Sequence, residues 1–487
     1  MRVNYSINAT PRFRMLSDEQ CEEIYFSALK VLHHTGVKVH SGEILALLSK
    51  CGVRVKGNHL AYIPSSVVQK ALDTAPKAFT VYGRGEESSK NIDVRPGHIH
   101  YGLGSGCVNF MNPRTGKRHN YTREDAATVA RVADALPNID FVQPLGTIPV
   151  TPEMVDVYEF AEMIANTTKP LVTYSRTLGI TKTIHKLAMA VSGGEEAFIR
   201  RPNFLLLGSP GSPLFADAEP SKRVVYCAEH HIPYISTSAV TCGATAPATP
   251  AGALVQVVAE ELMELVINQA ANPGAPFLMG GVHSVMDMKS GILAYGAPEM
   301  NMLLAAHTEI ARHIGLAFYS TAGCSDSKIV DKQAAMEGAL SVMISGLSGA
   351  NMIHDVGYIE FGTTGSLQQA VMMDEAIDMV KHFLRGIPVT KETMALDLID
   401  SVGPGGQYLD SKHTAEHFKT EFWFPSLMDR SYWDQWEAEG KKTLGDRIQE
   451  KLNHILDTHK VLPLPEQTRK EIDSILAEAE TVARQQS

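Results

Sequence analysis

The sequence lacks the marks of several protein classes. Its cysteines are few and lie far apart, at Cys21, Cys51, Cys107, Cys227, Cys242 and Cys324. None forms a CxxC pair, so neither a disulfide framework nor a zinc knuckle is expected. No stretch approaches the roughly 18 consecutive apolar residues of a membrane span, and the first residues have no apolar core typical of a secretory signal. We therefore expect a cytoplasmic protein with reduced thiols that does not bind a membrane.

Runs of positive charge are also missing. The chain has 44 Lys and Arg against 54 Asp and Glu, which gives a net charge of −10. A mildly acidic chain without a basic run is a poor candidate for binding nucleic acid. The hydrophobic fraction of 44% excludes a mostly disordered chain. With 487 residues, the chain is long enough for one large domain with additions or for two to three domains.

Short apolar runs alternate with helical patterns through the middle of the chain. Eight such runs occur, at 99–103, 141–146, 171–174, 204–208, 234–238, 277–281, 317–321 and 352–355. Apolar runs separated by helices indicate parallel strands that are buried on both faces. Eight βα repeats of this size predict an α/β fold of the (β/α)8 TIM barrel type.

The barrel would occupy residues 98–389. Residues 1–97 are expected to form an N-terminal α+β addition, and residues 390–487 a mostly helical C-terminal addition. A doubly wound open sheet is the alternative to the barrel. It would favour a phosphate-binding turn after the first strand, but residues 102–106 lack the GxGxxG spacing.

Glycines follow many of the predicted strands. In a barrel the active site lies at the C-terminal ends of the strands, and glycine lets the backbone approach a bulky ligand closely. A wide mouth that admits a large ligand is therefore predicted, with ordinary turn chemistry as the alternative. The glycines expected to face that ligand are Gly104, Gly106, Gly208, Gly211, Gly280 and Gly281.

Familiar catalytic motifs are absent. No HExxH, GxSxG or Walker A sequence occurs, and no spacing indicates a metal site, although His283, Cys324 and His354 could form one. Cys324 has no base beside it in the sequence, which argues against a nucleophile. Near residue 360, by contrast, carboxylates stand beside aromatic residues, a combination that suits a cation. The alternative is that Glu360 simply pairs with an Arg or Lys.

Several segments carry a resemblance to a known family. They are Ala135–Asp140, Gly323–Lys328 with Asp331 and Gln333–Ala335, Ser348–His354, Val402–Gly406 and Phe422–Pro425. Together they resemble the trimethylamine methyltransferase family, in the branch without pyrrolysine that includes glycine betaine:corrinoid methyltransferase. The resemblance implies a (β/α)8 barrel. It also implies methyl transfer to the cobalt of a corrinoid (cobalamin) that a separate small protein carries, so no tightly bound cofactor is expected.

The resemblance also bears on the substrate. Founding members use pyrrolysine for trimethylamine, whereas this chain has only standard residues in the corresponding region, near Glu360–Gly365. This argues for a quaternary amine, with glycine betaine preferred over proline betaine and carnitine. A quaternary nitrogen leaves as a neutral amine, here dimethylglycine, so the reaction needs neither a general acid nor a metal. The protein's task is then to position the substrate.

A set of substrate-binding residues follows as a hypothesis. The cationic group would lie among Tyr101, Tyr174, Tyr358 and Phe361, with Glu360 and Asp326 balancing its charge. The betaine carboxylate would bind His354, His283 or Arg176. A metal-assisted barrel enzyme and a non-catalytic betaine-binding protein remain alternatives. The aromatic segment Phe418–Trp436 is expected to pack the C-terminal addition, to join copies in a homo-oligomer, or to bind the corrinoid protein.

Overall fold

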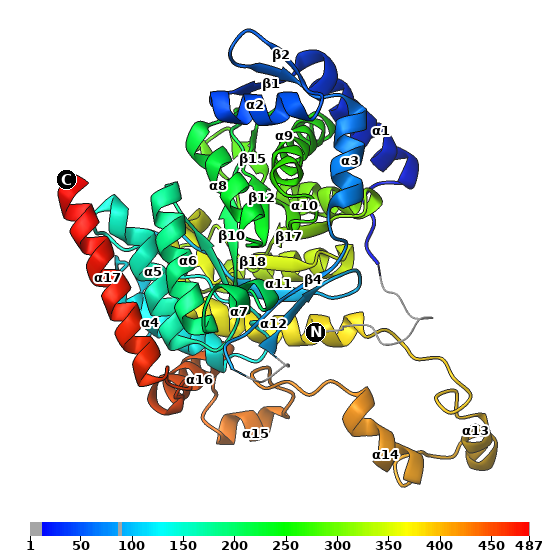
Figure 1. Cartoon of the computed structure of the whole chain (residues 1–487). Helices are drawn as coiled ribbons and strands as arrows, with labels where there is room; N and C mark the ends of the chain where they lie inside the picture. Colours follow the sequence, from blue (N-terminus) through cyan, green and yellow to red (C-terminus); the bar gives the residue numbers. More distant parts are fainter. Residues whose placement is uncertain (1–11, 86–89, 487) are drawn as a thin grey trace.

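The computed structural model describes residues 12–85 and 90–486, and parallel strands stand at its centre (Figure 1). Seven of them form one parallel sheet in the order β6-β18-β17-β14-β12-β10-β9. Their bounds are β6 His100–Leu103, β9 Leu171–Tyr174, β10 Phe204–Gly208, β12 Tyr234–Ser238, β14 Phe277–Gly281, β17 Ala317–Thr321 and β18 Met352–Val356. Each coincides with one of the predicted apolar runs.

The eighth run closes the sheet into a ring. Phe141 forms a parallel bridge with Gly102 of β6, and Val142 forms one with Leu171 of β9. Gly146 at the end of the run adds a third bridge, to Cys107. The run forms isolated bridges and no continuous ladder because Pro144 lies within it, and a proline has no N–H for a strand ladder. The closed ring confirms the (β/α)8 barrel, and the open-sheet alternative is wrong.

Helices surround the ring, as Figure 1 shows. The principal ones are α4 Arg123–Ala135, α5 Pro152–Asn166, α6 Leu178–Ser192, α8 Ala218–Glu229, α9 Pro250–Ala271, α10 Pro298–His313, α11 Lys332–Ser348 and α12 Leu367–Leu384, with a short α7 at Glu195–Arg200. Thr122 begins α4 with a capping box. Proline stands in the first turn of α5, α9 and α10, where its missing N–H costs nothing.

One end of the barrel is filled by a hairpin from the N-terminal part of the chain. Strands β4 (Phe79–Val81) and β5 (Ile92–Val94) pair antiparallel. Their apolar side chains form a buried cluster with the side chains of the barrel interior, which include Leu205, Ile235 and Leu278. Because this hairpin occupies one end, a substrate would enter at the other end, where the strands terminate.

Two small sheets frame that open end. One has the order β19-β20-β7-β8 and the other β13-β15-β16. Their strands are β7 Asn109–Met111, β8 Arg118–Asn120, β13 Thr241–Cys242, β15 Ser284–Asp287, β16 Ile292–Leu293, β19 Tyr358–Ile359 and β20 Thr364–Ser366, with a short 3-10 turn η3 at Glu360–Gly362. Loops that leave the barrel strands thus build a rim.

The N-terminal elements lie against the α9 side of the barrel (Figure 1). They are α1 Asp18–Lys30, the π-helical turn η1 Val31–Thr35, β1 Val37–Val39, α2 Gly42–Lys50, β2 Arg54–Lys56, β3 Leu60–Tyr62 and α3 Ser65–Thr74. Strand β1 pairs with β11 (Phe215–Ala216), which follows barrel strand β10. The N-terminal addition is therefore joined to the barrel by a shared sheet as well as by the hairpin. The predicted boundary at residue 97 stays a prediction.

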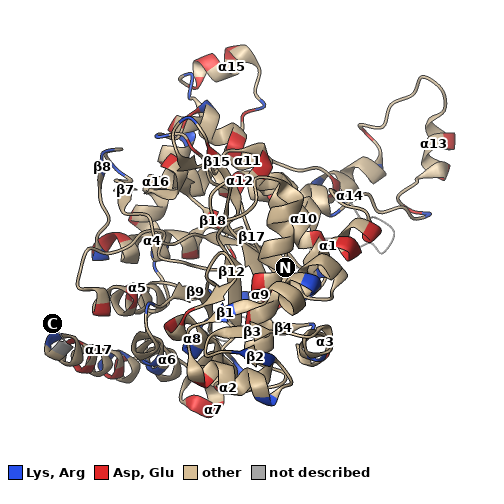
Figure 2. Cartoon of the chain, turned by 90° about the horizontal axis from the view of Figure 1, so that it is seen from above, with Lys and Arg blue, Asp and Glu red and all other residues tan. Residues whose placement is uncertain are grey.

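The C-terminal elements divide into two groups. Helices α16 (Leu444–Thr458) and α17 (Glu466–Gln486) pack on the barrel, α16 on α4 and α12 and α17 on α5 and α6. Helices α13 (Leu396–Val402) and α14 (Lys412–Glu421) stand clear of the body in Figure 1, and α13 does so in Figure 2 as well. The short α15 (Trp433–Ala438) lies between the groups in the chain.

Charged residues of both signs are scattered over the outer helices (Figure 2). Within the described residues, no helix is long and apolar enough to cross a membrane.

Ring closure depends on a glycine. A Cβ added to Gly102 would overlap the ring of Phe141. We expect Gly102→Ala to lower the free energy of unfolding by about 1–3 kcal/mol, the usual effect of overpacking a core. Urea unfolding would measure it. The control is Gly42→Ala in α2, where an added Cβ meets nothing within 4 Å. Equal stability of the two variants would contradict the proposed role of Gly102.

Candidate active site

An irregular strand end places a carboxylate at the open end of the barrel. The register between β18 and β6 shifts between Ile353 and Val356, and Asp355 has a φ of 70°. In a regular strand His354 and Asp355 would point to opposite faces. A bulge re-aims a side chain, and Asp355 Oδ1 lies where a Cβ on Gly104 would stand. Residues in such strained conformations cluster at functional sites. The region around this bulge is therefore a candidate active site.

His354 fixes the orientation of that carboxylate. Its ring stacks on Tyr319 with centroids 4.2 Å apart and planes 14° apart. Its Nδ1 lies 2.6 Å from Asp355 Oδ1, and because a carboxylate only accepts, Nδ1 donates this hydrogen bond. Its Nε2 lies 3.0 Å from the hydroxyl of Thr321 on the neighbouring strand β17. The imidazole is thus held on both nitrogens.

Three tyrosines gather around Asp355. Burial first, and the negative charge of Asp355 next, hold the pKa of Tyr295, Tyr319 and Tyr358 well above its usual value. The rings of Tyr295 and Tyr358 meet edge to face, with centroids 6.1 Å apart. The Tyr358 hydroxyl donates to the carbonyl of Ser105. All three side chains therefore remain neutral phenols, and His354 covers one face of the Tyr319 ring.

The barrel interior below this group carries polar atoms without partners. Gln143 Nε2 donates to the Tyr319 hydroxyl at 2.6 Å and to the Leu103 carbonyl at 2.8 Å. In the described part of the chain, however, Gln143 Oε1 and Thr237 Oγ1 are buried without a hydrogen-bond partner. Such atoms are rare in folded proteins. They indicate a place where a ligand or water completes the hydrogen bonding.

We call Gln143, Thr237, Tyr295, Tyr319, His354, Asp355 and Tyr358 the Asp355 cluster. Of the predicted substrate-binding residues, it contains His354 and Tyr358. Asp326 lies at its edge, where its carboxylate accepts hydrogen bonds of 2.9 Å from the backbone N–H groups of Tyr295 and Gly296. Burial raises the pKa of Asp326. Its contacts position Tyr295.

Glu360 and Phe361 lie beside the cluster on the rim. Glu360 forms an ion pair of 3.0 Å with Arg118 of β8 and accepts a hydrogen bond from Thr364. The Lys328 ammonium lies 5.7 Å from the centroid of the Phe361 ring. Both residues have a positive φ, 52° and 46°. Each thus already has a cationic partner from the protein.

Two other predicted residues face the surrounding helices. The Tyr101 hydroxyl donates to the carbonyl of Val342 in α11 at 3.0 Å. His283 Nε2 lies 3.2 Å from His307 Nδ1 in α10. Both side chains are fully buried between strands and helices. The structure does not bring them together with the Asp355 cluster.

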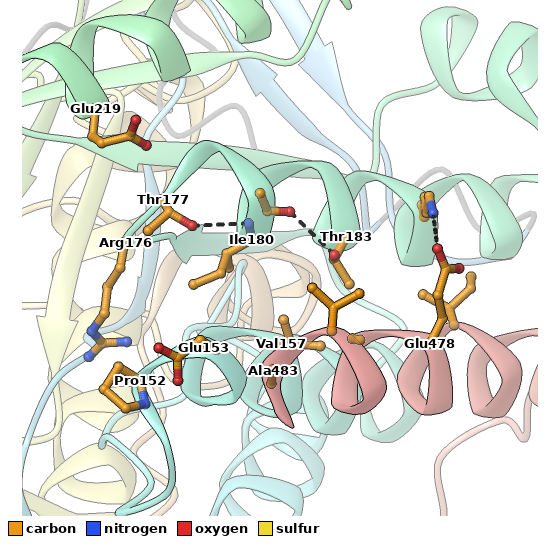
Figure 3. Close-up of a pocket in the computed structure, with 15 residues that line it drawn as sticks. Pro152, Glu153, Val157, Arg176, Thr177, Ile180, Thr183, Glu219, Glu478 and Ala483 are labelled. Carbon is orange, nitrogen blue, oxygen red and sulfur yellow. Dashed lines mark hydrogen bonds and ion pairs between the residues drawn. The ribbon is translucent and has the colours of Figure 1, made fainter. Parts of the chain in front are cut away.

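Tyr174 and Arg176 follow β9, where Tyr174 is exposed with the guanidinium of Arg223 over its ring, 5.1 Å from the centroid. Arg176 pairs with Asp156 of α5. Its side chain points toward Pro152 and Glu153 at one end of a groove between α5, α6 and α17 (Figure 3). This groove has a volume of about 480 Å³ and lies on the outside of the helical layer. Arg176 therefore lines this groove and is not part of the Asp355 cluster.

The predicted glycines have different surroundings. Gly104 makes room for Asp355 and Tyr358, and Gly280 lies against Thr237. A Cβ on Gly208, Gly211 or Gly281 would overlap Tyr234, Phe215 or His283 respectively, whereas Gly106 faces open space. Two of the six thus border the Asp355 cluster. Their role toward a corrinoid stays a prediction.

The residues considered for metal binding do not come together. Among residues 12–85 and 90–486, no group of three or more His, Cys, Asp or Glu side chains could hold a metal ion. Cys324 is buried, and burial raises the pKa of its thiol well above the usual value. It is therefore a poor nucleophile.

Four members of the cluster, Gln143, Thr237, Tyr319 and Tyr295, are not among the residues predicted from the sequence. Three of them, Tyr319, Gln143 and Thr237, lie inside apolar runs and therefore resemble core residues. Tyr295 lies in a loop far from the others in the chain. An inward face follows from the period of two along each strand, and this signal could have found the first three. Asp355 stood beside Glu360 in the same strand end, but only the bulge reveals its direction.

Comparison with known proteins places the chain in a family. The profile of the trimethylamine methyltransferase family (MTTB) matches residues 1–482. The chain belongs to the trimethylamine methyltransferase family. This confirms the resemblance seen in the sequence, and membership makes the chain a methyltransferase.

Relatives within the family cover nearly the whole chain. The trimethylamine methyltransferase MttB of Desulfitobacterium hafniense (strain DSM 10664 / DCB-2) is 35% identical over 468 residues, 95% of this chain and 93% of that protein. The glycine betaine methyltransferase of D. hafniense (strain Y51) is 30% identical over 438 residues, 89% of this chain and 90% of that protein. The solved Methanosarcina barkeri monomethylamine methyltransferase (MtmB) aligns with a TM-score of 0.49 at 10% identity, covering 97% of this chain and 89% of that chain.

Proposed function

We propose that this methyltransferase moves a methyl group from a quaternary amine, in first place glycine betaine, to the Co(I) of a corrinoid protein. The observation that carries the proposal is the strained bulge that holds Asp355 among three tyrosines. A relative named glycine betaine methyltransferase, at 30% identity, supports the choice of substrate.

The cluster has the chemistry that a quaternary ammonium needs. Such a group has no N–H and cannot donate a strong hydrogen bond, so ring faces and a negative charge must hold it. Each cation–π contact is worth about 0.5–2 kcal/mol. Tyr295, Tyr319 and Tyr358 supply the faces, and Asp355 supplies the charge.

Groups for the carboxylate end of a betaine also lie close by. The Thr237 hydroxyl is buried and has no partner among the described residues, so it is free to donate to a substrate carboxylate. His354 is held on both ring nitrogens, which suits it to orienting Asp355. We assign Thr237 to substrate binding and His354 to positioning.

The reaction requires little acid–base chemistry from the protein. The C–N bond breaks with its electron pair going to nitrogen, and the methyl carbon receives an electron pair from Co(I). Dimethylglycine leaves with a neutral tertiary nitrogen, so no proton has to be supplied at that atom. The residues of the cluster hold the methyl carbon in line for transfer, and such positioning can provide up to about 7–11 kcal/mol.

A substrate panel tests the proposal. The full chain is mixed with cob(I)alamin and, in separate reactions, with glycine betaine, proline betaine, carnitine, choline or trimethylamine. We expect glycine betaine to give the fastest formation of methylcobalamin, measured by the change in absorption spectrum. Omission of the protein is the control.

Other outcomes have distinct meanings. Fastest turnover of trimethylamine would contradict the quaternary substrate, and turnover of carnitine or proline betaine would move the assignment within that class. Binding of glycine betaine without methylcobalamin, also with the cognate corrinoid protein, would indicate a binding protein and overturn the proposed activity.

A further inference from the structure

The C-terminal part of the chain contains a segment whose side chains stay largely exposed in the described structure. We call residues 387–419 the arm; it carries α13 and most of α14. Arg385 holds its two ends together by binding the Thr420 carbonyl and the Glu421 carboxylate. No residue between these ends is buried. Figure 1 shows α13 and α14 projecting away from the body, and Figure 2 shows the same for α13.

The arm nevertheless has the side chains of an interface. Ile387, Val389, Leu396, Ile399 and Leu409 are all exposed, Leu409 to 82%. Helices as short as α13 and α14 are marginal in water on their own. Ordering such a segment costs conformational entropy that only burial of apolar surface offsets. The arm therefore needs a partner surface.

A matching surface exists on the body of the same chain. Along α11 only Lys332 and Glu337 carry charge, and apolar residues occur all around the helix. A helix of this kind is typical of a buried position. Yet Met336 is 68% exposed and Leu340 50% exposed, and Ile329, just before the helix, is 57% exposed. We call Ile329, Met336 and Leu340 the α11 face.

The charges on the two surfaces are complementary. Exposed Asp397 and Asp400 alternate with Leu396 and Ile399 in α13. Exposed Lys328 and Lys332 flank the α11 face. The carboxylates beside them are already engaged: Asp331 caps α11, and Glu337 accepts from Ser325 and Gln333. Apolar contact between the two surfaces would thus bring carboxylates toward ammonium groups, which favours one orientation.

We propose that two copies of this chain form a symmetric dimer in which the arm of each packs on the α11 face of the other. A two-fold axis makes such an exchange self-complementary, because the same contact occurs twice and leaves neither arm nor face uncovered. The arm alone supplies as many residues as the roughly 20–30 a side of a standard interface. A second copy is favoured over a different protein because both halves of the contact are present in this one sequence.

Solution mass tests the dimer. Light scattering on the full chain is expected to give twice 53.1 kDa. The arm variant Leu396→Asp/Ile399→Asp and the face variant Met336→Asp/Leu340→Asp are each expected to weaken dimerisation by at least 100-fold. Because all four side chains are exposed, the circular dichroism of each variant should match that of the wild type. The control is Ile199→Asp, which changes an exposed residue of α7 and should leave the dimer intact.

Cross-linking distinguishes exchange from folding back within one chain. A copy carrying Leu396→Cys and a differently tagged copy carrying Met336→Cys are mixed and treated with a flexible bismaleimide. We expect cross-links between the two tags. Wild-type chain controls for Cys51, the one native cysteine that is partly exposed in the described residues.

Three results would overturn the proposal. They are a monomeric wild type, a dimer that both paired variants leave intact, and cross-links that form only within a single chain carrying both cysteines. A wild type that is monomeric alone and binds its corrinoid protein through the arm would replace the second copy with that partner. None of these readouts uses methyl transfer, so the dimer and the proposed activity can fail separately.

Discussion

Asp355→Asn is expected to lower kcat/KM for glycine betaine by about 100-fold or more. The substitution keeps the shape of the side chain and removes the negative charge that faces the tyrosines. A factor of 100 corresponds to roughly 2.7 kcal/mol, which is less than the roughly 4 kcal/mol of attraction between two unit charges about 4 Å apart at an effective dielectric constant near 20. Methylcobalamin formation over a range of betaine concentrations measures the change.

The bulge makes this substitution a clean test. Asp355 has a φ of 70°, and asparagine tolerates this conformation as well as aspartate does. The fold should therefore survive, and an unchanged thermal midpoint would show that it does. If Asp355→Asn retained full kcat/KM, the Asp355 cluster would not be the cation site.

Glu360→Gln is the matched comparison. Glu360 is also a carboxylate near Tyr358, but it pairs with Arg118 at 3.0 Å. Removing its charge disturbs a partly exposed ion pair, which is worth little. We expect a change of only a few-fold. A loss as large as that of Asp355→Asn would restore Glu360 as the residue that balances the substrate charge.

The barrel could be predicted because its signal is repeated. Each strand is a short apolar run between helices, and eight such runs have similar spacing. The shortest element, Phe141–Val142, is still predicted because the apolar run continues to residue 146. The repeats do not show that the sheet closes into a ring. Closure depends on the pairing of Phe141 with β6 on one side and of Val142 with β9 on the other.

The site could be predicted only in part, because side-chain direction depends on details of the backbone. Tyr101 and Tyr358 look alike in sequence, yet Tyr101 points to α11 while Tyr358 reaches the cluster. Strand alternation separates inward from outward residues, but the bulge at Asp355 breaks that alternation. The sequence leaves two roles open for Glu360, charge balance for the substrate or pairing with an Arg or Lys. Its ion pair with Arg118 shows how a strand distant in sequence can neutralise a local charge.

Behind the rim lies a second buried carboxyl group that governs stability rather than substrate binding. Glu159 of α5 is buried, and its Oε1 accepts a hydrogen bond of 2.9 Å from the backbone N–H of Ile148. Burial first, and the nearby charge of Asp156 as well, raise the pKa of Glu159 to about 8. In the unfolded chain this pKa returns to its usual value near 4.5. Folding thus binds a proton at neutral pH.

Glu159→Gln is therefore expected to stabilise the protein at about pH 8 and to change nothing below about pH 4.5. Below the unfolded pKa both states of the wild type hold the proton, so pH has no effect through this group. As pH rises toward the folded pKa, the unfolded chain releases the proton while the folded chain keeps it, and wild-type stability falls. Glutamine has no proton to bind, and its amide oxygen still accepts from Ile148. The stabilisation should reach the order of 2–4 kcal/mol.

Thermal unfolding at about pH 5 and pH 8 measures this difference. The wild type should lose stability between the two values, and Glu159→Gln should lose less. Glu162→Gln is the control, because Glu162 lies one turn along α5, is partly exposed and pairs with Arg123 at 2.5 Å. If Glu159→Gln followed the same pH dependence as the wild type, Glu159 would be ionised in the folded protein. The negative charge of Glu159 would then be balanced by Arg176, which also pairs with Asp156 at the end of β9.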